Sequence, residues 1–264
     1  MTARAKKKPN WIVEKERQQK TKNKETLWLF GLHAVRDALS NPMRLKLRLI
    51  VTKNAFQKLE AEISTTDLEP EIVDARKFNA PIDPSSVHQG AAIEVKPLDW
   101  GDLTDICAPR GHPSLVVCLD RVSDPHNVGA ILRSAEVFGA RAVIATQRHA
   151  APETGALAKT ASGALERQPY IRVRNLAQTL RNLQEMGYYV LGMDGTADAS
   201  ITDLATDLAN RPVAIVLGAE GPGLRDLTKE TCDQLVKIDY ANDFGSLNVS
   251  NAAAVALYGF SLSR

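Results

Sequence analysis

The stretch Asp239-Tyr-Ala-Asn-Asp-Phe-Gly-Ser-Leu-Asn-Val-Ser-Asn-Ala-Ala-Ala-Val-Ala-Leu-Tyr258 decides how the end of the chain folds. It continues an apolar run at 234–239 that predicts a strand, crosses a polar loop, and enters an Ala- and Val-rich segment that predicts the last helix. Four polar residues lie where this helix would begin: Ser246, Asn248, Ser250 and Asn251. One Ser or Asn is enough to accept hydrogen bonds from the free N–H groups of a first helical turn. The surplus predicts a binding surface at the helix start.

The preceding residues alternate between short apolar runs and amphipathic segments. The runs predict strands at 114–120, 142–145, 170–173, 188–192 and 213–217, and the amphipathic segments predict helices at 128–138, 176–186 and 224–232. Such alternation predicts an α/β fold with a mostly parallel sheet covered on both faces. Ligands of such sheets bind beyond the carboxyl ends of the strands. Three polar or glycine-rich loops lie at such ends: 121–127, 218–223 and 240–248.

A smaller α/β unit is expected at residues 27–97, before this half of the chain. Residues 98–112 are rich in Gly, Pro and Asp, have little periodicity, and are expected to form a linker to a domain at 113–264. A chain of 264 residues with 44% hydrophobic composition is long enough for two domains.

The charge is unevenly distributed along the chain. Residues 1–26 hold nine Lys or Arg and three Glu, which is 9 − 3 = +6, so the remainder carries 2 − 6 = −4. A basic arm on a slightly acidic body is typical of proteins that bind phosphate. A solvated, flexible tail is the alternative, and the sequence leaves both open.

Cysteine usage and the absence of a secretory signal or a membrane-spanning run suggest a cellular location. Cys107, Cys118 and Cys232 are odd in number and widely spaced, which indicates neither a disulfide framework nor a zinc site. No secretory signal and no run of membrane-spanning length is present. We expect a soluble, cytoplasmic protein with no membrane partner. No metal-ligand cluster and no Ser-His-Asp spacing emerges, so we expect no metal.

The loop Gly218-Ala-Glu-Gly-Pro-Gly223 follows an apolar run. Its three glycines would let backbone groups approach a ligand closely, whereas an ordinary strand-to-helix turn needs only one. The spacing is neither the dinucleotide G-x-G-x-x-G nor a Walker motif. Glu220 within it is either a ligand for a polar group or an acid favoured by the dipole of the following helix.

The segment Asp124-Pro-His-Asn127 is the second candidate site, and Arg133 follows it. Pro125 makes the turn rigid, and Asn127 is expected to cap the next helix. Arg133 is either a solvated helix arginine or a residue that binds a phosphate through two parallel hydrogen bonds. His126 is expected to be structural.

Three segments together resemble the motifs of the SPOUT methyltransferases, specifically the SpoU/TrmH family of RNA ribose 2′-O-methyltransferases. They are residues 119–136, 215–224 and 238–250, in the order and at the separation of that family. In the small unit, residues 30–35 and 87–91 resemble the L30e-like RNA-binding domain of one subgroup. That subgroup methylates a guanosine 2′-hydroxyl in 23S rRNA, whereas the tRNA-modifying members lack the domain.

The resemblance implies a trefoil knot in the C-terminal domain, a homodimer, and S-adenosyl-L-methionine as methyl donor. The positions that match the family's cofactor contacts are Leu217, Gly218, Ile238, Leu247 and Asn248. The positions implied in catalysis are Arg133, Asn127, Glu220, Ser246 and Asn248. Because a guanidinium stays protonated in proteins and is a poor base, we expect Arg133 to hold a phosphate and stabilise the developing alkoxide, with the general base unassigned.

Target recognition is assigned to residues 1–97. The candidate RNA-binding side chains are His33, Arg36, Arg48, His88 and Gln89. Three alternatives remain open: a tRNA ribose methyltransferase, a non-catalytic RNA-binding or ribosome-assembly protein, and an unrelated nucleotide-dependent oxidoreductase. The missing dinucleotide motif disfavours the last.

Overall fold

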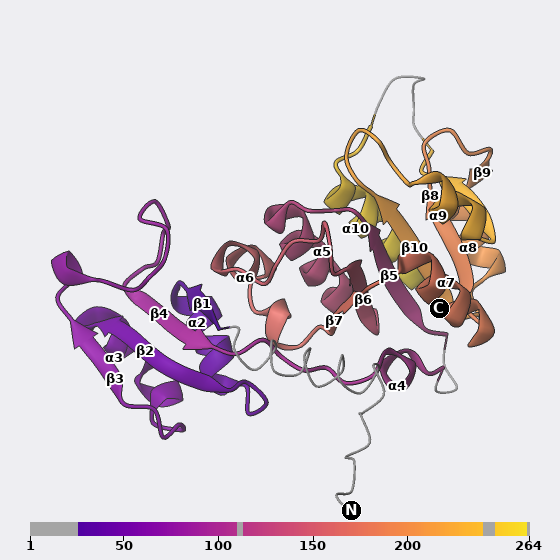
Figure 1. Ribbon diagram of the computed structural model, residues 1–264. Helices are drawn as coiled ribbons and strands as arrows, with labels where there is room; N and C mark the ends of the chain where they lie inside the picture. The colour runs from indigo at the N-terminus through magenta and orange to yellow at the C-terminus, as the bar shows by residue number, and fades with distance from the viewer. Residues whose placement is uncertain (1–25, 110–112, 240–245, 263–264) are drawn as a thin grey trace, which may run out of the picture.

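The computed structural model describes residues 26–109, 113–239 and 246–262, which form two α/β domains (Figure 1). The predicted basic tail, apart from Thr26, lies outside these residues, as does most of the loop predicted at 240–248. Both expected α/β units are present, so the fold class predicted from the sequence is confirmed.

The N-terminal domain is a four-stranded sheet with two helices on one face. Its strand order is β1-β4-β2-β3, with β2 and β3 parallel and the other pairs antiparallel. The helices contribute apolar side chains such as Val35 and Leu59 to a core shared with Leu49 and Ile93. The elements are β1 (Leu27–Phe30), α2 (Leu32–Ser40), β2 (Lys46–Thr52), α3 (Lys53–Ile63), β3 (Pro70–Val73), the 3-10 turn η1 (Ala75–Lys77) and β4 (Ala91–Val95).

The C-terminal domain is a seven-stranded sheet in which every pairing is parallel, in the order β7-β6-β5-β10-β8-β11-β9. Its central strands are buried on both faces, as the continuous apolar runs predicted. The strands are β5 (Leu115–Asp120), β6 (Ala142–Thr146), β7 (Tyr170–Val173), β8 (Tyr189–Met193), β9 (Ala199–Ser200), β10 (Val213–Gly218) and β11 (Gln234–Lys237).

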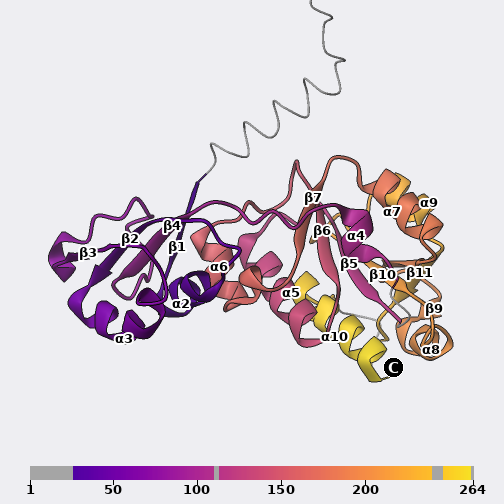
Figure 2. The same ribbon diagram turned by 90° about the horizontal axis from the view of Figure 1, so that it is seen from below.

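Helices cover both faces of this sheet (Figure 2). On one face lie α5 (Pro125–Val137), α6 (Gly155–Ala161), α8 (Ile201–Asp207) and α10 (Val249–Leu262), with the 3-10 turn η2 (Ala164–Glu166). On the other lie α4 (Leu103–Cys107), α7 (Leu176–Glu185) and α9 (Asp226–Thr231). Helices α4, α6 and α8 were not predicted, because segments of five to seven residues are too short to show a clear period.

The segment predicted as a linker is ordered against the C-terminal domain over part of its length. Cys107 at the end of α4 is fully buried. The Tyr188 hydroxyl donates to the Cys107 carbonyl at 2.7 Å, and the Arg141 guanidinium donates to the Ile106 carbonyl at 2.9 Å. Residues 103–107 of the expected linker therefore form a short helix packed on the C-terminal domain, whereas the domain boundaries stay predictions.

The two domains meet at a buried junction that we call the domain seam, formed by Phe30, Asn41, Arg44, Gly155 and Glu166. A Cβ atom at Gly155 would lie 2.1 Å from the Phe30 ring, so only glycine fits there. The Arg44 side chain is 0% exposed and its guanidinium lies 2.6 Å from the Glu166 carboxylate. Arg44 also donates to the Lys96 carbonyl at 2.8 Å, and the Asn41 amide donates to Glu166 at 2.9 Å. These contacts fix the N-terminal domain against α6 and η2.

Candidate active site

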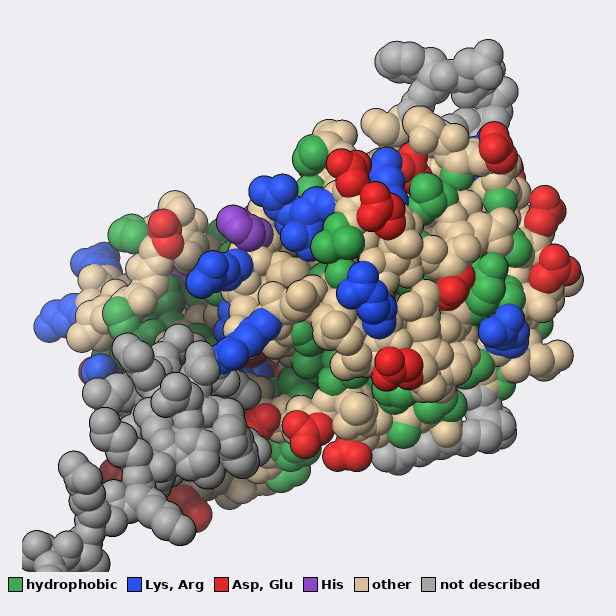
Figure 3. Space-filling view, turned by 45° about the vertical axis from the view of Figure 1, so that its right-hand side comes forward, with side chains coloured by type: hydrophobic (Ala, Val, Ile, Leu, Met, Phe, Trp, Pro, Cys, Tyr) green, Lys and Arg blue, Asp and Glu red, His purple; other side chains and the backbone are tan. Residues whose placement is uncertain are grey.

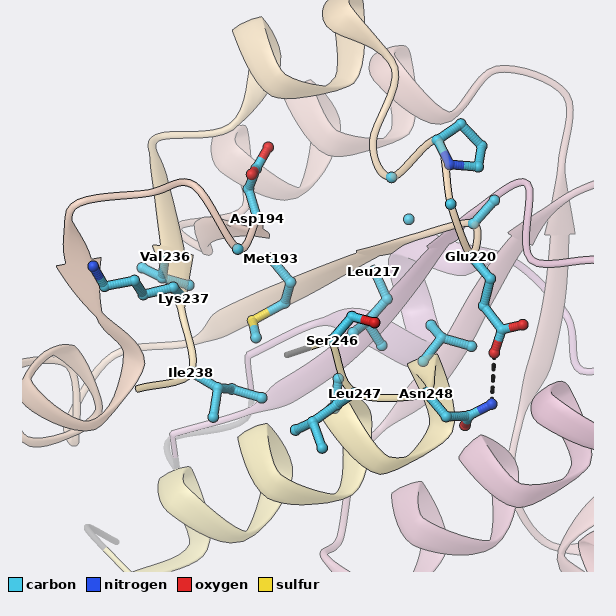
Figure 4. Close-up of a pocket in the computed structure, with 18 of the residues that line it drawn as sticks. Met193, Asp194, Leu217, Glu220, Val236, Lys237, Ile238, Ser246, Leu247 and Asn248 are labelled. Atoms are coloured by element: carbon cyan, nitrogen blue, oxygen red, sulfur yellow. Dashed lines mark hydrogen bonds between the residues drawn. The ribbon is translucent and has the colours of Figure 1, made fainter. Parts of the chain in front are cut away.

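A pocket of about 590 Å³ lies beyond the carboxyl ends of β8, β10 and β11 (Figure 4). This volume is within the range of small-molecule sites. Apolar side chains line it: Met193 and Val236, together with the three apolar residues predicted to bind the cofactor, Leu217, Ile238 and Leu247. Gly218, Ser246 and Asn248 line the same pocket. The structure therefore brings together the predicted cofactor positions, whereas their contact with a ligand stays a prediction.

The glycine-rich loop at 218–223 folds back on itself above this pocket. A Cβ at Gly218 would lie 2.2 Å from the Gly223 carbonyl carbon, and the Gly223 N–H donates to the Ala219 carbonyl at 2.9 Å. Gly221 and Gly223 have φ of 82° and 68°, a region that favours glycine. The glycines are thus required by the turn itself, and the turn leaves Glu220 at the rim of the pocket.

Three polar residues from distant parts of the chain meet at this rim, and we call them the polar junction: Asn127, Glu220 and Asn248. The Asn248 amide donates to the Glu220 carboxylate at 2.5 Å, a contact drawn in Figure 4, and to the Asn127 side-chain carbonyl at 3.0 Å. The Asn127 amide donates to the same Glu220 oxygen at 3.1 Å. Two amides therefore orient one carboxylate without neutralising it.

The ends of two helices place these side chains. Asp124, not Asn127, caps α5, since its carboxylate accepts the His126 N–H at 2.9 Å. The expected capping role of Asn127 was wrong, because Pro125 takes the first helical position and moves the helix start upstream. Asn248 caps α10 by accepting the Ser250 N–H at 2.9 Å.

Arg133 lies on α5 with an exposed side chain. Among the residues that the structure describes, it makes no hydrogen bond and no ion pair. Its guanidinium is therefore available to a ligand, although its role stays a prediction. His126 contacts the Thr160 hydroxyl at 3.2 Å through its ring Nδ1, which fits the structural role expected for it.

Asp120 is a residue of this region that the sequence analysis missed. It ends β5, is fully buried, and accepts hydrogen bonds from the Arg225 N–H at 3.1 Å and the Thr228 hydroxyl at 2.7 Å. The Arg225 guanidinium lies 2.7 Å from its carboxylate. Asp120 thus ties β5 to the chain that follows the glycine-rich loop. An acid at the end of an otherwise apolar strand was the available signal.

An ion pair at the pocket wall was also missed. The Lys229 ammonium lies 2.5 Å from the Asp194 carboxylate, and both residues line the pocket. The hydrogen bond from Lys229, together with the Thr196 N–H, lowers the pKa of Asp194 to about 2. The same bond raises the pKa of Lys229. Asp194 follows β8, so the rule that sites lie beyond strand ends could have identified it.

The cysteine thiols are buried and poorly suited to nucleophilic chemistry. Burial raises the pKa of Cys107 to about 11 and that of Cys232 to about 12, and it raises the pKa of Cys118 as well. Because the thiolate is the reactive form, these cysteines are mostly unreactive near neutral pH.

In the N-terminal domain, most of the predicted RNA-binding side chains make contacts within the domain. The Gln89 side-chain carbonyl accepts the Leu32 N–H at 3.0 Å. Arg36 pairs with Glu62 at 3.0 Å, and Arg48 pairs with Glu71 at 2.8 Å. These contacts give each side chain a structural role, and RNA binding by them stays a prediction.

The two histidines predicted to bind RNA differ in their surroundings. The His88 ring stacks on Phe78 with 4.0 Å between ring centroids, and its Nδ1 accepts the Gly90 N–H. His33 is exposed on α2. Both stay candidates for RNA contact.

Within the described residues, no helix is long and apolar enough to cross a bilayer. In the same residues, no group of three or more His, Cys, Asp or Glu side chains is placed to share a metal ion.

The sequence matches two family models that together span both domains. Residues 114–258 match the SpoU rRNA methylase family, and residues 28–100 match the model described as RNA 2'-O ribose methyltransferase substrate binding. The chain belongs to the SpoU rRNA methylase family.

Similar proteins cover nearly the whole chain. The 23S rRNA (guanosine-2'-O-)-methyltransferase RlmB of Vibrio vulnificus is 38% identical over 245 residues, which is 88% of this chain and 94% of the relative. The protein of the same name from Coxiella burnetii is 38% identical over 237 residues, 87% of this chain and 93% of the relative.

Solved structures share the fold. The SpoU methyltransferase AviRb from Streptomyces viridochromogenes, crystallised in complex with the cofactor AdoMet, has a TM-score of 0.77 at 22% identity and covers 93% of this chain and 92% of its own. The family resemblance and the fold class inferred from the sequence are therefore confirmed. The contact between Glu220 and Asn248 is compatible with the implied trefoil knot, and the knot itself stays a prediction.

Proposed function

We propose that this protein transfers a methyl group from S-adenosyl-L-methionine to the ribose 2′-hydroxyl of a guanosine in 23S rRNA. Relatives of that activity align with both domains at 38% identity, which supports the same substrate for this chain. The structural observation that carries the proposal is the polar junction, which joins the first and third motifs to Glu220 at the rim of the pocket.

The pocket fits the methyl donor by shape and polarity. Leu217, Ile238 and Leu247 provide an apolar slot of the kind that an adenine ring prefers, with glycine backbone along its edge. Glu220 lies beside it with its charge unneutralised by the two amides, which suits a cationic sulfonium. When bound, the donor supplies a methyl group on a positively charged sulfur, with a neutral thioether as leaving group.

The polar junction, Ser246 and Arg133 would position the ribose and stabilise the negative charge that develops on its 2′-oxygen. Arg133 would bind the phosphate beside the target nucleotide and stabilise negative charge on the 2′-oxygen as it loses its proton. Asn127, Asn248 and Ser246 would orient the hydroxyl, since amides and hydroxyls both donate and accept hydrogen bonds. Glu220 is hydrogen-bonded to Asn127 and Asn248, and it would be the candidate acceptor of the 2′-hydroxyl proton.

The N-terminal domain would present the RNA to this site. Its match to a substrate-binding family model supports that role. His33 and the stacked His88–Phe78 pair are the strongest candidates for RNA contact, because rings and exposed imidazoles suit unstacked bases. We expect Arg36, Arg48 and Gln89 to contribute less, since each makes a contact within the domain. A 23S rRNA substrate also supports a cytoplasmic location.

We propose that the protein is a homodimer through α5 and α10. Val255, Tyr258 and Leu262 are 44%, 52% and 69% exposed at positions that share one face of α10, and Val137 on α5 is 70% exposed. Arg133 lies one turn before Val137 on the same side of α5, so a second copy on this face would complete the surroundings of Arg133. Light scattering of the Val137→Glu/Leu262→Glu variant is expected to give a monomer with little methyl transfer. A dimer of unchanged activity would contradict this arrangement.

Methyl transfer from labelled S-adenosyl-L-methionine tests the proposal directly. Unmodified 23S rRNA is expected to accept label at one guanosine 2′-oxygen, located by alkaline-hydrolysis mapping, whereas bulk tRNA is not. Label on tRNA alone would favour the tRNA-modifying alternative. Binding of rRNA with no transfer would favour a non-catalytic assembly protein.

A further inference from the structure

We propose that a surface of the C-terminal domain, which we call the basic edge, binds the sugar-phosphate backbone of the RNA between the domain seam and the pocket. It consists of Arg121, Arg148, His149 and Arg172. This inference rests on the proposed function, and it adds an RNA-binding surface outside residues 1–97, the part of the chain that is expected to recognise the target.

The sheet brings these residues together at one border. Leu119 of β5 pairs with Ala145 of β6, and Thr146 of β6 pairs with Val173 of β7, so the three strands end side by side. Adjacent strands lie about 4.8 Å apart, which places the three strand ends within about 10 Å. Arg121 directly follows β5, and Arg148 and His149 follow β6.

The basic edge connects the two regions that RNA must contact. Residues 121–127 lead from Arg121 to Asn127 of the polar junction. Residues 147–154 run from the end of β6 to Gly155, which packs against Phe30 of the N-terminal domain. Backbone held by the N-terminal domain would therefore cross this edge before its ribose enters the pocket.

The edge is positive. Segments 121–127, 147–154 and 172–175 contain four Arg, one Asp and one Glu, which is 4 − 2 = +2. Of the two acids, Asp124 caps α5 and Glu153 lies 3.9 Å from the Arg44 guanidinium at the domain seam. Arg121 and Arg148 are exposed and, among the described residues, neither side chain is in an ion pair. Figure 3 shows Lys and Arg side chains gathered near a histidine on one face of the molecule. Unpaired arginines suit phosphate oxygens.

Two of these side chains are kept at positions that favour glycine. Arg121 has φ of 63° and His149 has φ of 66°, in the left-handed region that costs a residue with a Cβ free energy. Glycine would adopt either conformation without that cost. The arginine and the histidine therefore contribute something other than local stability.

The strain makes a sharp experiment possible. The Arg121→Gly/Arg148→Ala variant removes two charges and relieves one strained residue, so its melting temperature is expected to match or exceed that of the wild type. Arg181→Ala is the control. Arg181 is exposed on α7, which covers the face of the sheet opposite to α5. The probe is labelled, unmodified 23S rRNA.

The double variant is expected to bind this RNA more weakly, with the slope of log Kd against log salt reduced by roughly 1.4, or about 0.7 for each lost phosphate contact. KM for rRNA should rise several-fold, with kcat at saturating RNA and S-adenosyl-L-methionine affinity unchanged. An unchanged slope in a variant that still transfers methyl would overturn the basic edge and leave the proposed function intact. Absence of methyl transfer by the wild-type protein would overturn the proposed function. In that case the salt dependence of RNA binding would still test whether the basic edge contacts RNA.

Discussion

The domain seam and the pocket rim both gather polar side chains from distant parts of the chain. The two regions differ in how far these side chains are buried and paired. At the seam, the Arg44 side chain is 0% exposed and bonds to Glu166 and the Lys96 carbonyl. At the rim, the Glu220 carboxylate accepts hydrogen bonds from two amides, and on the neighbouring α5 Arg133 is exposed without a partner among the described residues. A buried, paired charge can serve only the fold, whereas an exposed, unpaired charge can meet a substrate. Burial and pairing therefore assign Arg44 to the fold, whereas Arg133 is available for the role proposed for it.

The largest effect on stability is expected at the seam. Arg44→Met should reduce the free energy of unfolding by about 3–5 kcal/mol, because it leaves the Glu166 carboxylate buried without its cation. Urea unfolding measures this. The Arg44→Met/Glu166→Gln variant, which also removes the stranded charge, should recover part of the loss. Equal stability of wild type and Arg44→Met would show that the seam is not a buried ion pair in solution.

The largest effect on activity is expected at Arg133. Arg133→Ala should lower kcat by about 10²–10³-fold, since it removes a group that stabilises transition-state charge. The unfolding midpoint and the Kd for S-adenosyl-L-methionine should remain near wild type. Arg133→Lys keeps the charge but loses the two-pronged geometry, and is expected to restore little of the rate. Loss of cofactor binding in Arg133→Ala would instead place Arg133 in the pocket.

Asp120 combines features of both regions, because it is buried like the seam yet supports the rim. Asp120→Asn should cost about 1–3 kcal/mol of stability through weakened bonds to Arg225 and Thr228. It should also weaken S-adenosyl-L-methionine binding, measured by calorimetry, as the chain after the glycine-rich loop loosens. A stable variant with wild-type affinity for S-adenosyl-L-methionine would show that Asp120 does not support the pocket.

The start of α10 allows a matched comparison of two asparagines. Asn248→Ala should cost about 1 kcal/mol through loss of the helix cap. It should also lower methyl transfer, because the polar junction loses the amide that contacts Glu220 and Asn127. Asn251→Ala, an exposed position three residues later, is the control and should change neither. Equal effects of the two substitutions on methyl transfer would show that Asn248 is not part of the active site.

The smallest effect is expected in the pH dependence of the Asp194–Lys229 pair. Because the pKa of Asp194 is lowered to about 2, its ionised form contributes stability above about pH 4, and this contribution is lost as the pH falls toward 2. Lys229→Met removes the main cause of the shift. The difference in unfolding free energy between wild type and Lys229→Met should therefore be present at pH 5 and shrink toward pH 2.5. A difference that does not change with pH would contradict this coupling.

Much of this molecule was predictable from local patterns. The alternating strands and helices, the parallel sheet and the three loops at strand ends follow from periodicity and turn chemistry, which nearby residues determine. The three motifs also identified the family. Local patterns failed where a neighbouring residue took the expected role, as when Asp124 rather than Asn127 capped α5.

The sequence by itself determined which segments become strands and helices and which polar residues lie at strand ends. Only the tertiary structure decided which of those residues meet. Asn127 and Asn248 are 121 residues apart and Arg44 and Glu166 are 122 apart, yet one pair forms the rim and the other the seam. The physical reason is that hydrophobic periodicity is a short-range property, whereas contacts over such separations depend on the order in which the sheet arranges its strands.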